Sequence, residues 1–277
     1  MRIAWHVGIE NSSSGRIPKP ELLWKACETY RAGVAAPGTK VELVFSRFRA
    51  LSLHPYLCAV SNLLVAEEVA ALAAQGYDAV LLGSSQDPGL DESRNIVDIP
   101  VVASIESSLA MSTFLGRKAA ILTIQGIDGE RTYPRAMEAA ASKYGLRDRL
   151  IAHRPVRTYP FDNKEFWEVY NRALEGDGAQ FLSAFDQVTA QMVSDGAEVI
   201  ILGMEFTAAL LHKLGRGFMT KEGVPCLDVA AAGVKTLESL VGLKTSRGVQ
   251  KSQESVFRTP PTELLAAARD YQRKNVP

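Results

Sequence analysis

Two short loops of this 277-residue chain carry the side chains best suited to acid/base chemistry. Glu205 follows the apolar run 199–202 and a glycine, a position that would partly desolvate its carboxylate. Desolvation raises the pKa of a carboxylate towards the range of a general base. Ser84 and Ser85 follow a matching run, where hydroxyls can bind a substrate carboxylate together with backbone N–H groups. The structural alternative is that Glu205 caps a helix or pairs with a cation, and that the serines cap a helix.

Three further residues are candidates for the same site. His6 lies near the end of the first predicted strand and is a catalytic candidate, although a lone histidine there is more often structural. Asp87 lies in Asp-Pro-Gly, which is a turn signature in its own right, so a turn is the favoured interpretation and substrate contact the alternative. Thr207, two residues beyond Glu205, is a candidate for substrate contact.

Other chemistries have weaker support in the sequence. A nucleophilic serine needs an activating base, and no Gly-x-Ser-x-Gly elbow is present. A metal site from His6, His54, Asp87 and Glu205 is conceivable, but no His-x-His or His-x-x-x-His spacing supports it. Neither a Gly-x-Gly-x-x-Gly nor a Walker loop occurs, so we expect no nucleotide. The sequence therefore predicts a site that uses no metal and no cofactor.

The two loops end segments that repeat one pattern. Residues 76–83 and 196–203 both read as glycine, any residue, an acid, four apolar residues and glycine. Each copy leads to a second short apolar run, and these runs contain Pro100 and Pro225. The repetition predicts two related halves, each with a loop at the end of a buried strand. We expect the site where these loops face each other.

Strand-like and helix-like segments alternate along the chain. Beside the repeated runs, we expect strands at 2–8, 40–45, 118–123 and 150–156, and helices at 21–31, 61–75, 107–115, 133–144, 181–195, 230–240 and from 260 onward. Such alternation is typical of parallel sheets with helices on both faces and ligand sites at the strand ends. The predicted fold is α/β, with two pseudo-symmetric Rossmann-like domains and an interdomain cleft. The expected domains are residues 1–115 plus 228–277, and 116–227.

The composition narrows the classes of partner and the compartment that we expect for the protein. The 31 basic and 31 acidic residues give no reason to expect nucleic acid or a membrane surface as partner. No apolar run approaches the ~20 residues of a membrane span, and we expect no signal peptide. Three widely spaced cysteines are typical of a reducing compartment. We therefore expect a cytoplasmic homo-oligomer that binds a small-molecule substrate.

The motifs around the first loop carry a family resemblance. Residues 78–83, the run Asp87-Pro88-Gly89-Leu90-Asp91 and the run Ile99-Pro100-Val101-Val102 resemble the hydantoin racemase branch of the aspartate/glutamate racemase superfamily. The resemblance covers most of the chain. It implies two pseudo-symmetric α/β domains and cofactor-independent proton transfer at a carbon next to a carbonyl. In that family two cysteines, one at each strand-end loop, act on opposite faces of the substrate.

This chain departs from the family pattern at both cysteine positions. Ser84 stands at the first position and Met204 at the second. The three cysteines present, Cys27, Cys58 and Cys226, cannot replace them by position. A thiol with a pKa near ~8.5 can serve as base or acid around neutral pH, whereas serine alone is a poor base and methionine exchanges no proton. A symmetric two-thiol racemase is therefore excluded.

The resemblance also implies further substrate contacts. It places the first-strand loop and the irregular segment 46–60 beside the site, and it matches one threonine that faces the substrate. The residues concerned are Glu10, Asn11, Ser12, His54 and Thr123.

The leading hypothesis is an isomerase or lyase that acts on a small carboxylate or cyclic amide. Glu205 would be the acid/base, and Ser84, Ser85 and Thr123 would hold the carboxylate or enolate. One alternative is a hydrolase that opens a cyclic amide with a carboxylate-activated water. The other is a non-catalytic paralogue that binds a metabolite.

Overall fold

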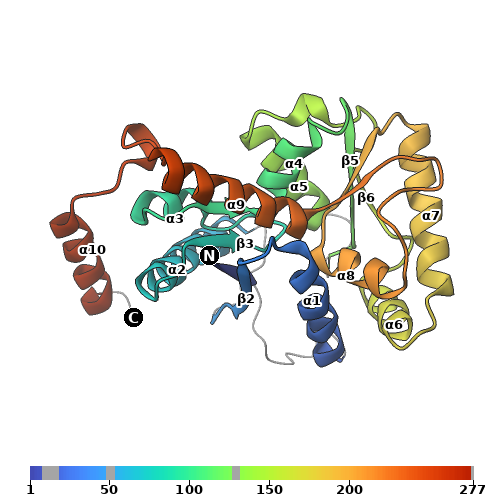
Figure 1. Ribbon diagram of the computed structural model, residues 1–277, viewed down its shortest axis with the longest axis horizontal. Coiled ribbons are helices and arrows are strands. Elements are labelled where there is room, and N and C mark those ends of the chain that lie inside the picture. Colours follow the sequence, from blue (N-terminus) through green and yellow to red (C-terminus); the bar gives the residue numbers. More distant parts are fainter. Residues whose placement is uncertain (8–18, 48–53, 127–131, 276–277) are drawn as a thin grey trace.

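The strands form two parallel sheets (Figure 1). The computed structural model describes residues 1–7, 19–47, 54–126 and 132–275. Within them, each sheet has four strands, in the orders β2-β1-β3-β4 and β6-β5-β7-β8. The strands are β1 (Arg2–Val7), β2 (Lys40–Phe45), β3 (Ala79–Leu82), β4 (Val101–Ala103), β5 (Ala119–Thr123), β6 (Val156–Thr158), β7 (Val199–Leu202) and β8 (Cys226–Asp228).

The two sheets have the same topology, because adding four to each strand number of the first order gives the second. The repeated apolar runs are β3 and β7, which occupy equivalent places beside the central strands β1 and β5. All strand pairs within the sheets are parallel. The predicted α/β fold with two pseudo-symmetric halves is confirmed, while the cleft between the halves stays a prediction.

Helices connect the strands and cover the sheets. In the described residues they are α1 (Pro20–Val34), α2 (Pro55–Ala74), α3 (Leu90–Ile96), α4 (Ser104–Ser112), α5 (Thr132–Lys143), α6 (Asn163–Leu174), α7 (Ala179–Ser194), α8 (Glu205–Lys213), α9 (Val229–Arg247) and α10 (Thr262–Asn275). Two short 3-10 turns, Arg147–Arg149 and Ser255–Phe257, complete the regular structure.

Two local expectations from the sequence are wrong, and helix α6 was not anticipated. Residues 55–60 are helical rather than irregular, because Pro55 supplies a preset φ at the first position of α2. The strand expected at 150–156 lies at 156–158, and Leu150 makes only an isolated bridge to Ala119. The segment from 161 to 176 contains α6, which Asp162 caps by accepting a hydrogen bond from the Glu165 N–H.

Helix α2 also corrects the expectation about membrane spans. A window of 18 residues within this 20-residue helix has a mean hydropathy of 1.7, so by length and composition alone the helix could cross a membrane. One such helix is weak support for a membrane protein. In the folded chain, Val65, Val69 and Leu72 of α2 pack against Ala4 of β1 and Val80 of β3.

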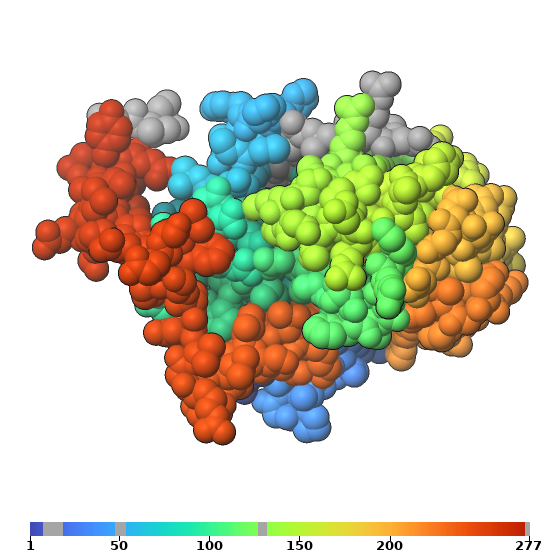
Figure 2. Space-filling model, turned by 90° about the horizontal axis from the view of Figure 1, so that it is seen from above, coloured from blue at the N-terminus to red at the C-terminus, as the bar shows by residue number. Residues whose placement is uncertain are grey.

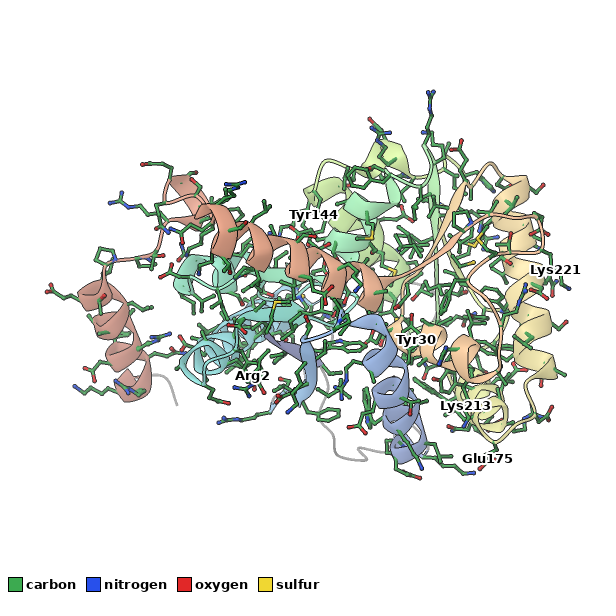
Figure 3. The ribbon with its side chains drawn as sticks, viewed as in Figure 1. Arg2, Tyr30, Tyr144, Glu175, Lys213 and Lys221 are labelled. Atoms are coloured by element: carbon green, nitrogen blue, oxygen red, sulfur yellow. The ribbon has the colours of Figure 1, made fainter. Side chains whose placement is uncertain are left out.

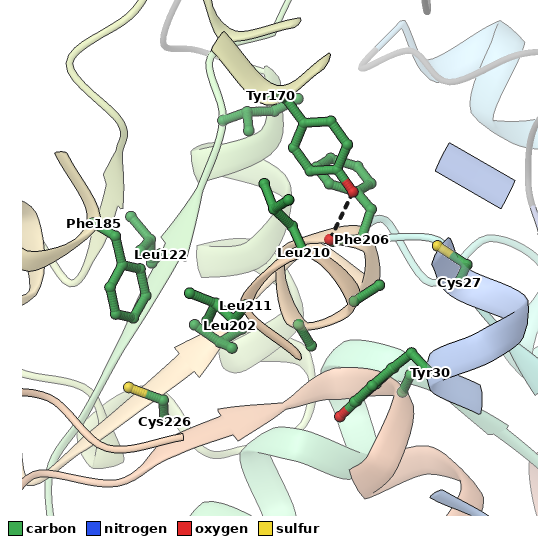
Figure 4. Packing of buried hydrophobic residues seen from close by; sticks show 14 of the residues in the cluster. Cys27, Tyr30, Leu122, Tyr170, Phe185, Leu202, Phe206, Leu210, Leu211 and Cys226 are labelled. Atoms are coloured by element: carbon green, nitrogen blue, oxygen red, sulfur yellow. Dashed lines mark hydrogen bonds between the residues drawn. The ribbon is translucent and has the colours of Figure 1, made fainter. Parts of the chain in front are cut away.

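One hydrophobic core runs through both halves. It joins Trp5 and Cys27 of the first half to Leu122, Leu202 and Phe206 of the second. The close-up of this core shows Tyr170 donating a hydrogen bond to the Phe206 carbonyl at 2.9 Å (Figure 4). This bond and the surrounding rings hold the first turn of α8, which is the element that begins at the candidate base. Both halves therefore share the packing that positions one site loop.

After β8 the chain crosses back to the first sheet. Gly233 of α9 lies so close to β3 that a side-chain carbon there would come within 3.0 Å of Leu81. The C-terminal segment then docks on the same half, where Arg269 of α10 donates to Glu67 of α2 at 3.0 Å. The last residues, in red, form one margin of the molecule (Figure 2). This path supports the proposed assignment of α9 and the residues after it to the first domain, while Asp228 is the last residue of β8 in the second sheet.

Candidate functional site

Glu205 is a buried carboxylate at the start of a helix. It is the first residue of α8, directly beyond the end of β7, and its exposed fraction is 8%. Burial raises its pKa to about 7, and the nearby carboxylate of Asp228 adds to the rise. Within the described residues no cation forms an ion pair with it, which removes that structural alternative. A carboxyl group of this kind can take up or release a proton near neutral pH.

Asp228 is a second buried acid beside it, which the sequence analysis missed. It ends β8, where it pairs in register with Leu202 of β7. Its carboxylate accepts hydrogen bonds from the N–H groups of Ala230 at 3.1 Å and Ala231 at 2.8 Å, which caps α9. Tyr30 donates a third bond at 2.9 Å. Burial raises the pKa of Asp228 to about 6. An acid directly before an alanine-rich helix is a capping signal that could have identified it.

Ser84 and Ser85 follow β3 and are both 6% exposed. The helix that comes next, α3, has Gly89 as its N-cap and no side-chain cap. Helix capping therefore does not explain the serine pair. Their place at the end of β3 is equivalent to that of Glu205 at the end of β7, and contact with a substrate stays a prediction.

Asp87 has a structural role that its turn signature did not reveal. Its φ of 46° places it in the left-handed region, three residues after Ser84. Its carboxylate accepts hydrogen bonds from Ile105 N–H at 3.2 Å and Glu106 N–H at 3.1 Å, so it caps α4 from a distant loop. Tyr144 donates to it at 2.8 Å. Burial raises the pKa of Asp87 to about 7, and its contact with substrate stays a prediction.

His6 belongs to a buried polar cluster at the ends of β1 and β2. Its Nε2 lies 2.7 Å from Oε2 of Glu68 on α2. Glu68 also accepts from the Ser46 hydroxyl and the Arg47 N–H, both at 2.8 Å. Burial acts to raise the pKa of Glu68, but these hydrogen bonds together hold that pKa below its usual value. The carboxylate can fix the orientation and tautomer of the imidazole. Glu68 was missed, although an acid in so apolar a helix is a usable signal.

The other expected contacts lie in different surroundings. Thr123 ends β5 with 1% exposure, and its hydroxyl finds no hydrogen-bond partner among the described residues. Thr207 is buried in the first turn of α8. His54 is exposed and immediately precedes α2. Glu10, Asn11 and Ser12 lie outside the described residues. The same described part of the chain holds no group of three or more His, Cys, Asp or Glu that could bind a metal.

The three buried acids should make the stability of the protein depend on pH. The pKa values of Asp87, Glu205 and Asp228 rise from ordinary values of 3.8, 4.5 and 3.8 to about 7, 7 and 6. At pH values between the ordinary and the raised pKa values, the folded chain keeps protons on these acids that the unfolded chain has released. We therefore expect the urea midpoint of unfolding to fall as the pH rises from 5 to 7.5. Asp228→Asn should flatten this slope, and an unchanged midpoint across that range in the unmodified protein would contradict the assignment.

Comparisons with known proteins find related racemases. The model of the Asp/Glu/hydantoin racemase family matches residues 23–237. The hydantoin racemase of Pseudomonas sp. (strain NS671) is 27% identical over 255 residues, which cover 90% of this chain and 92% of that protein. The hydantoin racemase of Rhizobium meliloti is 26% identical over 196 residues, 70% of each chain.

A solved structure shows the same fold. The allantoin racemase from Klebsiella pneumoniae superimposes with a TM-score of 0.71 at 23% identity, covering 95% of this chain and 94% of that one. At this identity the likeness concerns the fold alone. Together with the family match, it supports the two-domain arrangement anticipated from the repeated strand-end loops.

Proposed function

We propose, from the premise that this chain belongs to the Asp/Glu/hydantoin racemase family, that it is an isomerase-type enzyme that works without the two thiols. The reaction would move a proton at a carbon next to a carbonyl, in a small carboxylate or a cyclic amide. The related hydantoin racemases support a racemase or isomerase type of activity. The positions of Ser84 and Met204 favour a mechanism with one proton-transferring carboxylate.

The observation that carries the proposal is the burial of Glu205, which has no cationic partner among the described residues. In this mechanism its carboxylate removes the proton from the substrate carbon and becomes a carboxylic acid. The same acid then returns a proton to the carbanion or enolate. A pKa of about 7 makes both forms accessible at neutral pH, which is the requirement for a group that acts first as base and then as acid.

Hydroxyl groups would bind the oxygen atoms of the substrate. We assign this role to Ser84, Ser85 and Thr123. The Thr123 hydroxyl has no partner in the described part of the chain, which supports this role because buried hydroxyls normally have a partner. His6, oriented by Glu68, is the candidate for a second proton donor. No metal or cofactor is needed for these steps.

Proton NMR in heavy water tests the proposal directly. The purified protein is incubated with separate panels of amino acids, hydantoins and substituted malonates. We expect solvent deuterium to enter the carbon next to the carbonyl in one class, or carbon dioxide to leave a malonate. Ring opening without deuterium at that carbon would indicate the hydrolase. A ligand-induced rise in melting temperature without any turnover would indicate the binding paralogue.

We further propose that the protein acts in the cytoplasm as a homo-oligomer. The three cysteines are free thiols, which supports a reducing compartment. Exposed apolar side chains support association, among them Phe114 with 87% exposure and Leu243 with 46%. Size-exclusion chromatography with light scattering would measure the assembly.

A further inference from the structure

Two tyrosine–aspartate hydrogen bonds join the two halves of the molecule. Tyr30 on α1, in the first half, donates to Oδ2 of Asp228 at the end of β8 in the second half, at 2.9 Å. Tyr144, directly after α5 in the second half, donates to Oδ2 of Asp87 in the first half, at 2.8 Å. In Figure 3, Tyr144 lies above α9 and Tyr30 below it. Each half thus supplies one donor and one acceptor.

The tyrosines and the capped helices occupy equivalent places under the pseudo-symmetry of the fold, whereas Asp228 ends β8 and Asp87 lies in the loop after β3. Helices α1 and α5 are the first helices after the central strands β1 and β5, and each tyrosine comes in or just after the latter part of its helix. Each aspartate also accepts two backbone N–H groups at the start of a helix, α9 for Asp228 and α4 for Asp87. On each side, one tyrosine therefore completes a helix cap by donating to an aspartate of the opposite half.

Both tyrosines are held firmly by the half they enter. The ring of Tyr30 packs against His212 and Phe218, at centroid distances of 5.5 and 6.0 Å. Beside Tyr144, Lys143 forms an ion pair with Asp91 at 2.8 Å, which also crosses between the halves. Their packing shows that the two bonds are parts of extended contacts across the boundary.

Each bond also fastens a strand-end loop of the candidate site. Asp228 pairs in register with Leu202, the residue three positions before Glu205. The N–H of Asp87 donates to the carbonyl of Ser84 at 3.0 Å, which closes the turn that carries the serine pair. A change in either bond would therefore shift a loop that carries a candidate catalytic residue.

We infer that the bonds Tyr30–Asp228 and Tyr144–Asp87 are a matched pair of clamps that fix the orientation of the two halves. Tyr30 and Tyr144 are positioning residues, because they set the place of the Glu205 loop relative to the Ser84 loop. The inference goes beyond the proposed function, since the clamps would hold the halves whatever reaction the site catalyses. Because the two clamps stabilise one shared arrangement, opening one should loosen the other.

Hydrogen exchange of the backbone, read by mass spectrometry, tests this coupling without a substrate. Tyr30→Phe is expected to speed exchange at its own cap, the start of α9, roughly tenfold, the effect of losing a hydrogen bond to a charged group. It should also speed exchange at the start of α4, which Tyr144 clamps. Tyr144→Phe should show the reverse pattern, and the double variant should fall short of the product of the single effects, because each single variant already weakens both clamps.

Tyr77→Phe is the matched control. Tyr77 donates to Glu42 at 2.8 Å, so its loss removes a tyrosine–carboxylate bond within the first half. This variant should leave exchange at both capped helix starts unchanged. If Tyr30→Phe affects only α9 and Tyr144→Phe only α4, the bonds are local caps and the clamp is wrong. Asp87→Asn and Asp228→Asn, which keep an oxygen acceptor, provide a second pair should a phenylalanine variant not fold, and they should show weaker effects of the same cross pattern.

Discussion

Glu205→Gln is expected to slow deuterium incorporation into the true substrate at least roughly a hundredfold, the usual contribution of a positioned acid/base group. Glutamine has nearly the shape of glutamate but cannot accept the proton from carbon. The side chain is buried beyond β7, and no cation among the described residues pairs with it, so the substitution breaks no described ion pair. The measurement is the initial rate by NMR in heavy water, for the substrate class that the panel identifies.

The control for this variant is Glu165→Gln. Glu165 also lies in the first turn of a helix, α6, but its side chain is exposed. We expect full activity for this variant and an unchanged fold for both. Since a neutral side chain avoids placing a charge in the interior, Glu205→Gln should be at least as stable as the unmodified protein at pH 8. Full activity of Glu205→Gln would remove this residue from the mechanism.

The pH dependence gives an independent check on the same group. A base must be ionised in the free enzyme, so kcat/KM should rise with pH through about 7, the value to which burial raises the pKa of Glu205. Below that pH the carboxyl group is protonated and cannot accept the substrate proton. A profile that is flat between pH 5 and 8 would contradict the role of base.

Gly83→Ala is expected to lower the free energy of unfolding by about 1–3 kcal/mol, the range for overpacking a well-packed core. A side-chain carbon at this position would overlap the indole of Trp5 and lie 2.6 Å from its Cδ1. Trp5 is 1% exposed in the core and cannot move aside freely. The strand-end glycine is thus required by close packing. Urea unfolding at one fixed pH measures the change.

Gly242→Ala is the matched glycine control for that experiment. Gly242 lies inside α9, and nothing lies within 4 Å of the place that a side-chain carbon would take. Alanine should therefore stabilise the helix by about 1 kcal/mol, the difference in helix propensity. Shifts of the urea midpoint in opposite directions for the two substitutions would separate the effect of packing from that of helix propensity. An unchanged midpoint for Gly83→Ala would contradict the close approach.

The sequence alone was sufficient for the architecture, while the place of the site stays a prediction. The repeated pattern ending at Gly83 and Gly203 predicted two related halves, because a buried parallel strand has a periodicity and a glycine stop that are local in sequence. The same reasoning identified Glu205 as a buried acid, and the family resemblance predicts that Ser84 and Met204 stand where the family has thiols. These features depend on neighbouring residues, which a linear pattern contains.

Only the tertiary structure decided which side chains meet. His6 and Glu68 are 62 residues apart, Tyr30 and Asp228 are 198 apart, and Tyr144 and Asp87 are 57 apart. Such pairs depend on how helices pack on sheets and on how the two halves meet, and their spacing follows no local period. The sequence therefore predicted the loops of the candidate site, and the packing of the halves determined the hydrogen bonds that hold these loops.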